Sequence, residues 1–166
     1  MGAVRVIIFH PPPPPGTLSG VLAQARDALI EHQTALFRAA GATTVEVVRD
    51  RASSFGAALR QLMNGRTRAT AGPSPRTPRT AGAPGTPGVV VLGAGAVPLL
   101  RHSDAVRLVA AAAAGGPRAG TNNRYSSDVC ALGDARVLPA GPDLPGDNAL
   151  PRWLAERAGV SVAELP

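Results

Sequence analysis

The chain has 166 residues, enough for one domain with a hydrophobic core, and only 3% of them are aromatic. Its net charge of +6 comes largely from segment 65–87, which contains four arginines and no acidic residue. Such a segment attracts polyanions weakly and in a salt-sensitive way. It has no interleaved aromatic residues for base stacking, so specific nucleic-acid recognition is not expected.

The first half of the chain predicts a β-α-β unit. Val4–Phe9 is apolar on both faces and predicts a central strand, which the run Pro11–Pro15 ends. A helix is predicted over 18–40, and Gly41 ends it. The expected apolar stripe of this helix is Leu18, Leu22, Ala25, Leu29, Leu36 and Ala40. Thr43–Val48 then predicts a second strand.

A short helix and a low-complexity insert separate this unit from the second half. The helix is predicted over 54–63, capped by a serine and closed by Asn64 and Gly65. Segment 65–87 is rich in Thr, Pro, Arg, Gly and Ala and buries too little apolar surface to offset its ordering entropy. We therefore expect a flexible insert at 65–87 within a single domain that spans residues 1–166.

The second half continues the alternation of strands and helices. Gly88–Leu92 predicts a third strand, and Ala105–Ala114 predicts an alanine-rich helix capped by Ser103 or Asp104. Further strands are expected at 128–132 and 136–138, then a loop flanked by Asp143 and Asp147, which serve turns and a cap. Asp147 or Asn148 caps a last helix that runs to about residue 158, and Ser161 starts one more turn. This pattern indicates an α/β fold: a three-layer, Rossmann-like, mostly parallel sheet with helices on both faces.

A glycine-rich loop, GAGAVP, follows the valine-rich third strand. Gly93 and Gly95 match part of the dinucleotide-binding fingerprint, and ligands usually bind at the carboxyl ends of buried parallel strands. However, Pro98 stands where the third glycine is required, and no acid follows about 20 residues later. A tight turn of small residues is the favoured interpretation, with Gly93 and Gly95 as candidate ligand contacts.

Two other loops supply candidate ligand contacts. In the first strand-to-helix turn, only the amides after the prolines can donate to a phosphate, because proline lacks an N–H. The densest polar cluster precedes the fourth predicted strand, and its amides and guanidinium suit a phosphate, a carboxylate or a base edge; turn chemistry is the alternative. The candidates are Gly16 and Thr17 in the first loop, and Asn122, Asn123, Arg124 and Asp128 in the second.

The histidines and the single cysteine are interpreted as structural or unliganded. His10 and His102 follow strands whose ends share one edge of the predicted sheet, and Asp104 or Asp128 would have to complete a metal site there. Exposed, unliganded histidines are favoured, so no metal ligand is assigned. Cys130 lies in an apolar run, which indicates a buried structural thiol.

The sequence also predicts where the protein resides. No apolar run reaches the ~20 residues of a membrane span, and the segment before the prolines is too short for a signal peptide. We therefore expect a cytoplasmic protein that has no membrane partner. The richness in Gly, Pro and Arg indicates a GC-rich, bacterial genome.

Two segments resemble those of MobA-like nucleotidyltransferases. EHQTALFRAAGATTVEVV, residues 31–48, resembles the helix that ends in an Ala-Gly turn before the family's second strand. GVVVLGAGAVPLL, residues 88–100, resembles the third strand and its Asp-x-Pro-Leu-Leu motif. The resemblance implies a glycosyltransferase-A type fold, a nucleotide ligand and magnesium. In this chain Ala96 stands at the family's metal-binding aspartate, and prolines replace its glycine-rich first loop.

Three hypotheses follow from these departures. The favoured one is a degenerate nucleotidyltransferase-like domain that binds a nucleotide or a phosphorylated metabolite with weak or no catalysis. The second is an active magnesium-dependent nucleotidyltransferase whose metal is held elsewhere, for instance by Asp128. The third is a non-catalytic interaction protein that uses the basic insert at 65–87.

Overall fold

One six-stranded sheet organises the domain. The computed structural model describes residues 2–10, 17–49, 54–69 and 87–165. The strands lie in the order β2-β1-β3-β5-β4-β6, and β5 alone runs antiparallel to its neighbours. Their bounds are β1 (Val4–Phe9), β2 (Thr44–Val48), β3 (Gly88–Gly93), β4 (Arg118–Thr121), β5 (Val129–Leu132) and β6 (Ser161–Glu164). The mostly parallel α/β sheet is therefore confirmed.

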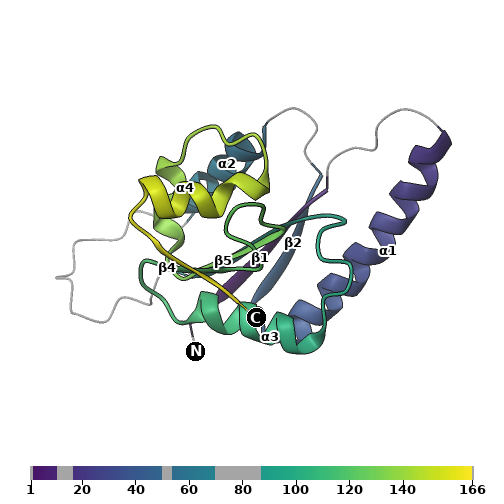
Figure 1. The fold of residues 1–166 in the computed structure, drawn as a ribbon, viewed down its shortest axis with the longest axis horizontal. Coiled ribbons are helices and arrows are strands. Elements are labelled where there is room, and N and C mark those ends of the chain that lie inside the picture. Colours follow the sequence, from purple (N-terminus) through teal and green to yellow (C-terminus); the bar gives the residue numbers. More distant parts are fainter. Residues whose placement is uncertain (1, 11–16, 50–53, 70–86, 166) are drawn as a thin grey trace.

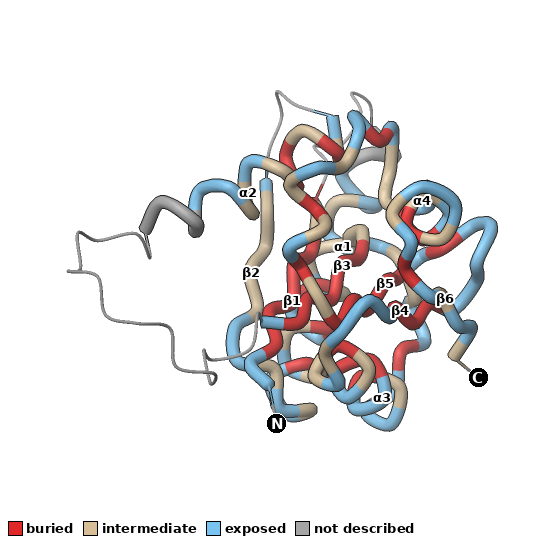
Figure 2. Tube along the Cα trace, turned by 90° about the vertical axis from the view of Figure 1, so that its left-hand side faces the viewer, coloured by how far each residue is buried: buried red, intermediate tan, exposed pale blue. Residues whose placement is uncertain are grey.

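Helices cover both faces of this sheet (Figure 1). One face packs against α1 (Thr17–Ala39) and α3 (His102–Ala113). The other packs against α2 (Phe55–Ala69), the 3₁₀ helix η1 (Ala135–Ala140) and α4 (Leu150–Arg157). Figure 2 shows the buried strands between exposed helical surfaces. The predicted three-layer architecture is thus confirmed.

The two predicted hydrophobic strands β1 and β3 lie side by side and in parallel. Their register runs from Val4 opposite Gly88 to Phe9 opposite Gly93. Alternate residues of β1 enter opposite cores: Val6 and Ile8 pack toward α1 and α3, and Ile7 packs toward α2 and α4. Fully burying each such side chain contributes about 1.5–3 kcal/mol, so β1 anchors both layers.

Helix α1 matches its predicted bounds but not its predicted stripe. Gly41 has a φ of +93°, and the chain turns there into β2. The fully buried face is formed by Ile30, Gln33 and Phe37, whereas Val21 and Leu22 are 67% and 49% exposed. The predicted stripe is wrong in the first half because those turns project from the body of the domain (Figure 1). None of the described helices, this one included, is long and apolar enough to cross a membrane.

Several predicted boundaries are wrong around the insert and in the last third. Helix α2 continues through Asn64 and Gly65 to Ala69; residues 70–86, the rest of the predicted insert, lie outside the described part of the chain. The strand predicted at 136–138 is the helix η1, because the Asp134 side chain accepts a hydrogen bond from the backbone N–H of Arg136 and caps a helical turn.

The sequence-based interpretation missed the two short strands β4 and β6. Each has only four residues, and β4 contains Gly120, so neither carries a strong apolar alternation. The expected turn at Ser161 is strand β6, which pairs in parallel with β4. The predicted cap of α3 is also shifted: the helix begins at His102, and Asp104 accepts from the backbone N–H of Arg101. The last helix starts later than predicted, after a 3₁₀ turn at Asp147–Ala149.

Cys130 is 2% exposed in β5, so the predicted structural thiol is confirmed. Burial raises its pKa to about 12. Because the thiolate is the reactive form, we expect the native domain to resist a disulfide reagent such as Ellman's reagent, and one thiol per chain to react after denaturation in guanidinium. Rapid labelling of the native protein at pH 8 would contradict this burial.

Candidate functional site

A cavity of about 570 Å³ opens at the carboxyl edge of β1, β2 and β3. In the order β2-β1-β3-β5-β4, the connection from β1 leads to β2 on one side, and the connection from β3 leads to β4 on the other. The strand order therefore reverses between β1 and β3, which is the kind of switch point at which α/β sheets usually bind ligands. The described residues that line the cavity are Phe9, His10, Val48, Ser54, Phe55, Ala58, Gly93, Ala94, Gly95, Ala96, Asp128, Pro145, Gly146 and Asp147. The volume lies in the range of small-molecule sites.

The glycine-rich loop after β3 forms one wall of this cavity. Gly93 permits close approach of Asp147, because a Cβ there would lie 2.7 Å from its Oδ2 atom. Gly95 has a φ of +92°, a conformation that favours glycine. The backbone carbonyl of Ala96 accepts a hydrogen bond of 2.6 Å from the buried amide of Gln33. The candidate contacts Gly93 and Gly95 therefore both line the cavity, together with Ala96.

Two carboxylates enter the cavity from different elements. Asp128 stands just before β5; since β5 is antiparallel to β3, its first residues lie at the same edge as the end of β3. Asp147 comes from the turn before α4 and is half-buried. Burial raises the pKa of Asp147, the negative charge of Asp128 raises it further, and backbone N–H donors, including that of Gly93, oppose the rise. The negative charges of Asp128 and Asp147 therefore repel each other.

A charged network holds the histidine at the end of β1. His10 is 6% exposed and lines the cavity, so the expectation of an exposed histidine is wrong at this position; the end of β1 is covered by α1 and by the residues after β2. Its Nε2 atom lies 3.0 Å from Asp27 Oδ1 of α1, and the same oxygen accepts a bond of 3.2 Å from Arg49 after β2. The hydrogen bonds from His10 and Arg49 hold the pKa of Asp27 below its usual range. The first half of α1 is thereby linked to the ends of two strands.

In the polar cluster before β5, the side-chain amides of Asn122 and Asn123 form hydrogen bonds with other groups of the protein. Asn122 donates to Asp128 Oδ2 at 2.9 Å and accepts from the Asp128 backbone N–H at 3.0 Å. Asn123 accepts from the backbone N–H groups of Tyr125 and Ser126, as in a turn. Arg124 is exposed, and its backbone N–H donates to Glu164. Asn122 thus positions Asp128, while Asn123 and Arg124 are not among the described lining residues.

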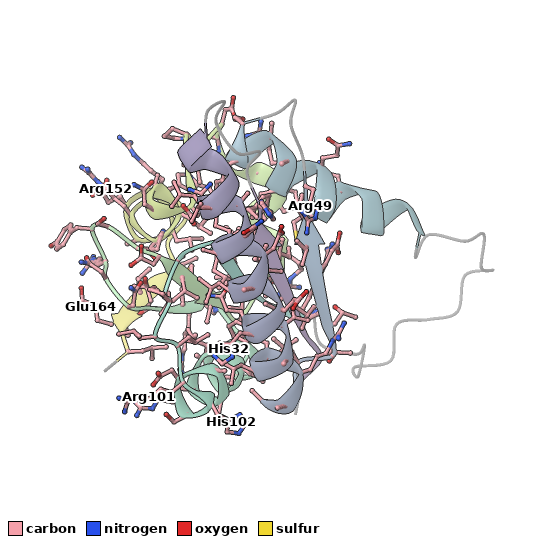
Figure 3. The ribbon with its side chains drawn as sticks, turned by 90° about the vertical axis from the view of Figure 1, so that its right-hand side faces the viewer. His32, Arg49, Arg101, His102, Arg152 and Glu164 are labelled. Carbon is pink, nitrogen blue, oxygen red and sulfur yellow. The ribbon has the colours of Figure 1, made fainter. Side chains whose placement is uncertain are left out.

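The other predicted site residues lie outside this arrangement or outside the described residues. Gly16 is not described, and for Thr17 only the backbone, the first residue of α1, is described. His102 is exposed at the start of α3 (Figure 3), and it is not among the described residues that line the cavity with His10. Within the described ranges, no three His, Cys, Asp or Glu side chains gather closely enough to hold a metal by themselves.

The sequence interpretation missed three residues of the site. Asp27 and Gln33 lie on α1, and Asp147 was assigned only to a turn and a cap. Gln33 carries a detectable signal, because a polar residue interrupts the buried helical face of Ile30 and Phe37. Asp27 and Asp147 carry no such signal in the sequence, because their roles depend on contacts with strand ends that are distant along the chain.

The sequence matches no protein-family model, and no curated protein is significantly similar to it. Among solved structures, the chain is similar to a crystal structure of a candidate nucleotide-diphospho-sugar transferase from Desulfovibrio desulfuricans G20. The TM-score is 0.53 at 12% sequence identity, over 100% of this chain and 80% of that chain. The likeness concerns the fold alone and does not single out MobA. The chain therefore shares the overall α/β fold of that structure.

Proposed function

We propose that this domain binds a nucleotide or a phosphorylated metabolite in the cavity at the carboxyl edge, with weak or no catalysis. The observation that carries the proposal is the cavity of about 570 Å³ at the switch point between β1 and β3. Its apolar wall includes Phe9 and Phe55, whose rings pack edge to face with their centroids 4.8 Å apart. These rings offer a surface for a nucleobase. The similar solved structure, a candidate nucleotide-diphospho-sugar transferase, supports this ligand class.

The expectation of weak catalysis rests on Ala96. It lines the cavity at the position where the resembled family carries its metal-binding aspartate. A methyl group cannot coordinate magnesium, which takes oxygen ligands. The ligand can still occupy the cavity, because binding there uses the strand ends and the loop backbone as well.

A second candidate function is an active magnesium-dependent nucleotidyltransferase with a displaced metal site. Asp128 and Asp147 favour it, because both line the cavity. Burial raises the pKa of Asp147, and the negative charge of Asp128 adds a smaller rise. A cation between them would relieve this repulsion, and Mg²⁺ is usually bound by one or two carboxylates together with substrate phosphates. Bound there, magnesium would neutralise charge on the transferred phosphoryl group, while Asn122 keeps Asp128 oriented.

Thermal-shift titration tests the proposed binding. With GTP, CTP or ATP at about 100 times the dissociation constant, linkage adds about 2.7 kcal/mol to stability. For a domain of this size we expect the melting temperature to rise by about 5–10 °C with at least one of these nucleotides. Measurements with and without magnesium separate direct binding from cation-dependent binding. No shift with any nucleotide or with simple sugar phosphates would reject the proposal.

A further inference from the structure

One buried polar side chain of α1 contacts the glycine-rich loop of the candidate cavity from outside the cavity. Gln33 is 0% exposed and lies on the same buried face of α1 as Ile30 and Phe37. Its Nε2 atom donates to the carbonyl of Ala96 at 2.6 Å, with a longer contact of 3.5 Å to the carbonyl of Val97. Gln33 is not among the described lining residues, so any effect that it has on a ligand in the cavity passes through the loop.

Stability alone does not explain an amide at position 33. The Oε1 atom of Gln33 is buried and has no hydrogen-bond partner among the described residues. A buried polar atom without a partner costs free energy, and an unbranched apolar side chain of similar length would avoid this cost. What the amide provides is therefore the hydrogen bond from Nε2 to the loop.

The loop is strained next to this hydrogen bond. Val97 has a φ of +48°, and among the described residues it is the one non-glycine residue with a positive φ. This left-handed conformation is especially unfavourable for a β-branched side chain. The Ala96–Val97 peptide joins two hydrogen-bonded turns, 93–96 and 97–100. Rotation of this one peptide by about half a turn would bring Val97 to a relaxed, extended φ and turn the Ala96 carbonyl away from Gln33.

We propose that Gln33 is a positioning residue for ligand binding, because its hydrogen bond to Ala96 holds the strained loop in the conformation that forms the cavity wall. Without this bond the peptide turns over, Val97 relaxes, and the wall changes at Ala96, which lines the cavity. Strained backbone persists at ligand sites where the surrounding structure imposes it. This inference rests on the proposed function, since it assumes that a nucleotide binds in the cavity.

Loss of the amide should weaken nucleotide binding and leave the fold intact. In Gln33→Met, the strain of one left-handed residue is sufficient to favour the relaxed loop about tenfold. The apparent dissociation constant rises as the binding-competent fraction falls, so the affinity for GTP, CTP or ATP should drop by about tenfold. The melting temperature should stay close to that of the wild type, because the unpartnered Oε1 atom is removed and the half-exposed loop lets the Ala96 carbonyl reach water.

A second substitution, at Val97, separates positioning from packing. Glycine adopts a positive φ without strain, so Val97→Gly added to Gln33→Met should restore most of the lost affinity. Val97→Ala in the same background is the matched control, since alanine also removes the larger side chain but still disfavours the left-handed region; it should restore much less. Gln24→Met, at an exposed position of α1, controls for the change from glutamine to methionine. Calorimetric titration with GTP, CTP and ATP measures each affinity.

A measurement on the wild type is independent of whether the variants fold. A positive φ brings the amide and α protons of one residue unusually close, so Val97 should show a strong intraresidue nuclear Overhauser effect between them, which weakens in Gln33→Met. A weak effect in the wild type overturns the inference and leaves the proposed function intact. Unchanged affinity or a large loss of stability in Gln33→Met, or equal rescue by glycine and alanine, does the same. Absence of binding by every nucleotide overturns the proposed function, and the role of Gln33 in binding with it.

Discussion

Asp128→Asn is expected to make nucleotide binding insensitive to magnesium, with affinity in the presence of magnesium reduced more than tenfold. Among the described lining residues, Asp128 and Asp147 carry the carboxylates, and an amide oxygen replaces a charged ligand poorly. Even partners behind a metal ligand typically change metal affinity by about 10- to 100-fold. If the domain transfers nucleotides, the same change should abolish turnover. The measurement is titration of GTP, CTP and ATP with and without magnesium, followed by a turnover assay.

The matched control is Glu156→Gln, which also removes one negative charge. Glu156 is an exposed residue of α4 that pairs with Arg152 at 3.0 Å, away from the cavity. It should leave the magnesium dependence unchanged. The asparagine at position 128 can still accept from Asn122, so loss of the turn is not expected. Equal magnesium dependence in Asp128→Asn and the wild type would reject a cation site at Asp128 and, with it, the second candidate function.

Gly88→Ala is expected to destabilise the domain by about 3 kcal/mol. Gly88 is buried at the start of β3, and a Cβ there would overlap the backbone carbonyl of Ala112 in α3. Both partners are backbone of regular elements, so neither can move without shifting the strand or the helix. For a domain of this size we expect the melting temperature to fall by about 6–12 °C in circular dichroism or calorimetry.

Gly20→Ala serves as the comparison for the same chemical change. Gly20 lies within α1, and a Cβ there would meet no atom within 4 Å. Alanine favours a helix over glycine by about 0.5–1 kcal/mol, so this variant should keep or slightly raise the melting temperature. Similar melting temperatures for Gly20→Ala and Gly88→Ala would contradict the close contact between β3 and α3.

The sequence predicted the central part of the fold well. The strands β1 and β3 were identified because both of their faces are apolar, as burial between two cores requires. The bounds of α1 and the position of α3 followed from helical spacing and end signals, although the stripe predicted for α1 was wrong in its first half. The short strands β4 and β6 were missed, because four-residue segments with glycine or polar residues acquire their pairing from neighbours in the sheet. The reversal of β5 was not predicted either, since hydrophobic content does not encode strand direction.

The sequence predicted the glycine loop of the candidate site and one of its acids. Gly93 and Gly95 follow directly from a strand and a loop motif, and both line the cavity. Asp128 was proposed for a displaced metal, but its partner Asp147 was interpreted as a cap. His10 and Asp27 are 17 residues apart, and their contact depends on how α1 crosses back over the sheet. Such long-range contacts between side chains cannot be inferred from local periodicity.

The antiparallel direction of β5 has a consequence for how such domains change over time. In an all-parallel sheet, the strands themselves bring only the residues that follow them to the ligand edge. Here the hairpin from β4 to β5 brings residues that precede a strand to the same edge, and Asp128 is one of them. A single reversed strand therefore gives the scaffold a second, genetically independent source of functional groups, from which a lost one can be replaced without rebuilding the backbone.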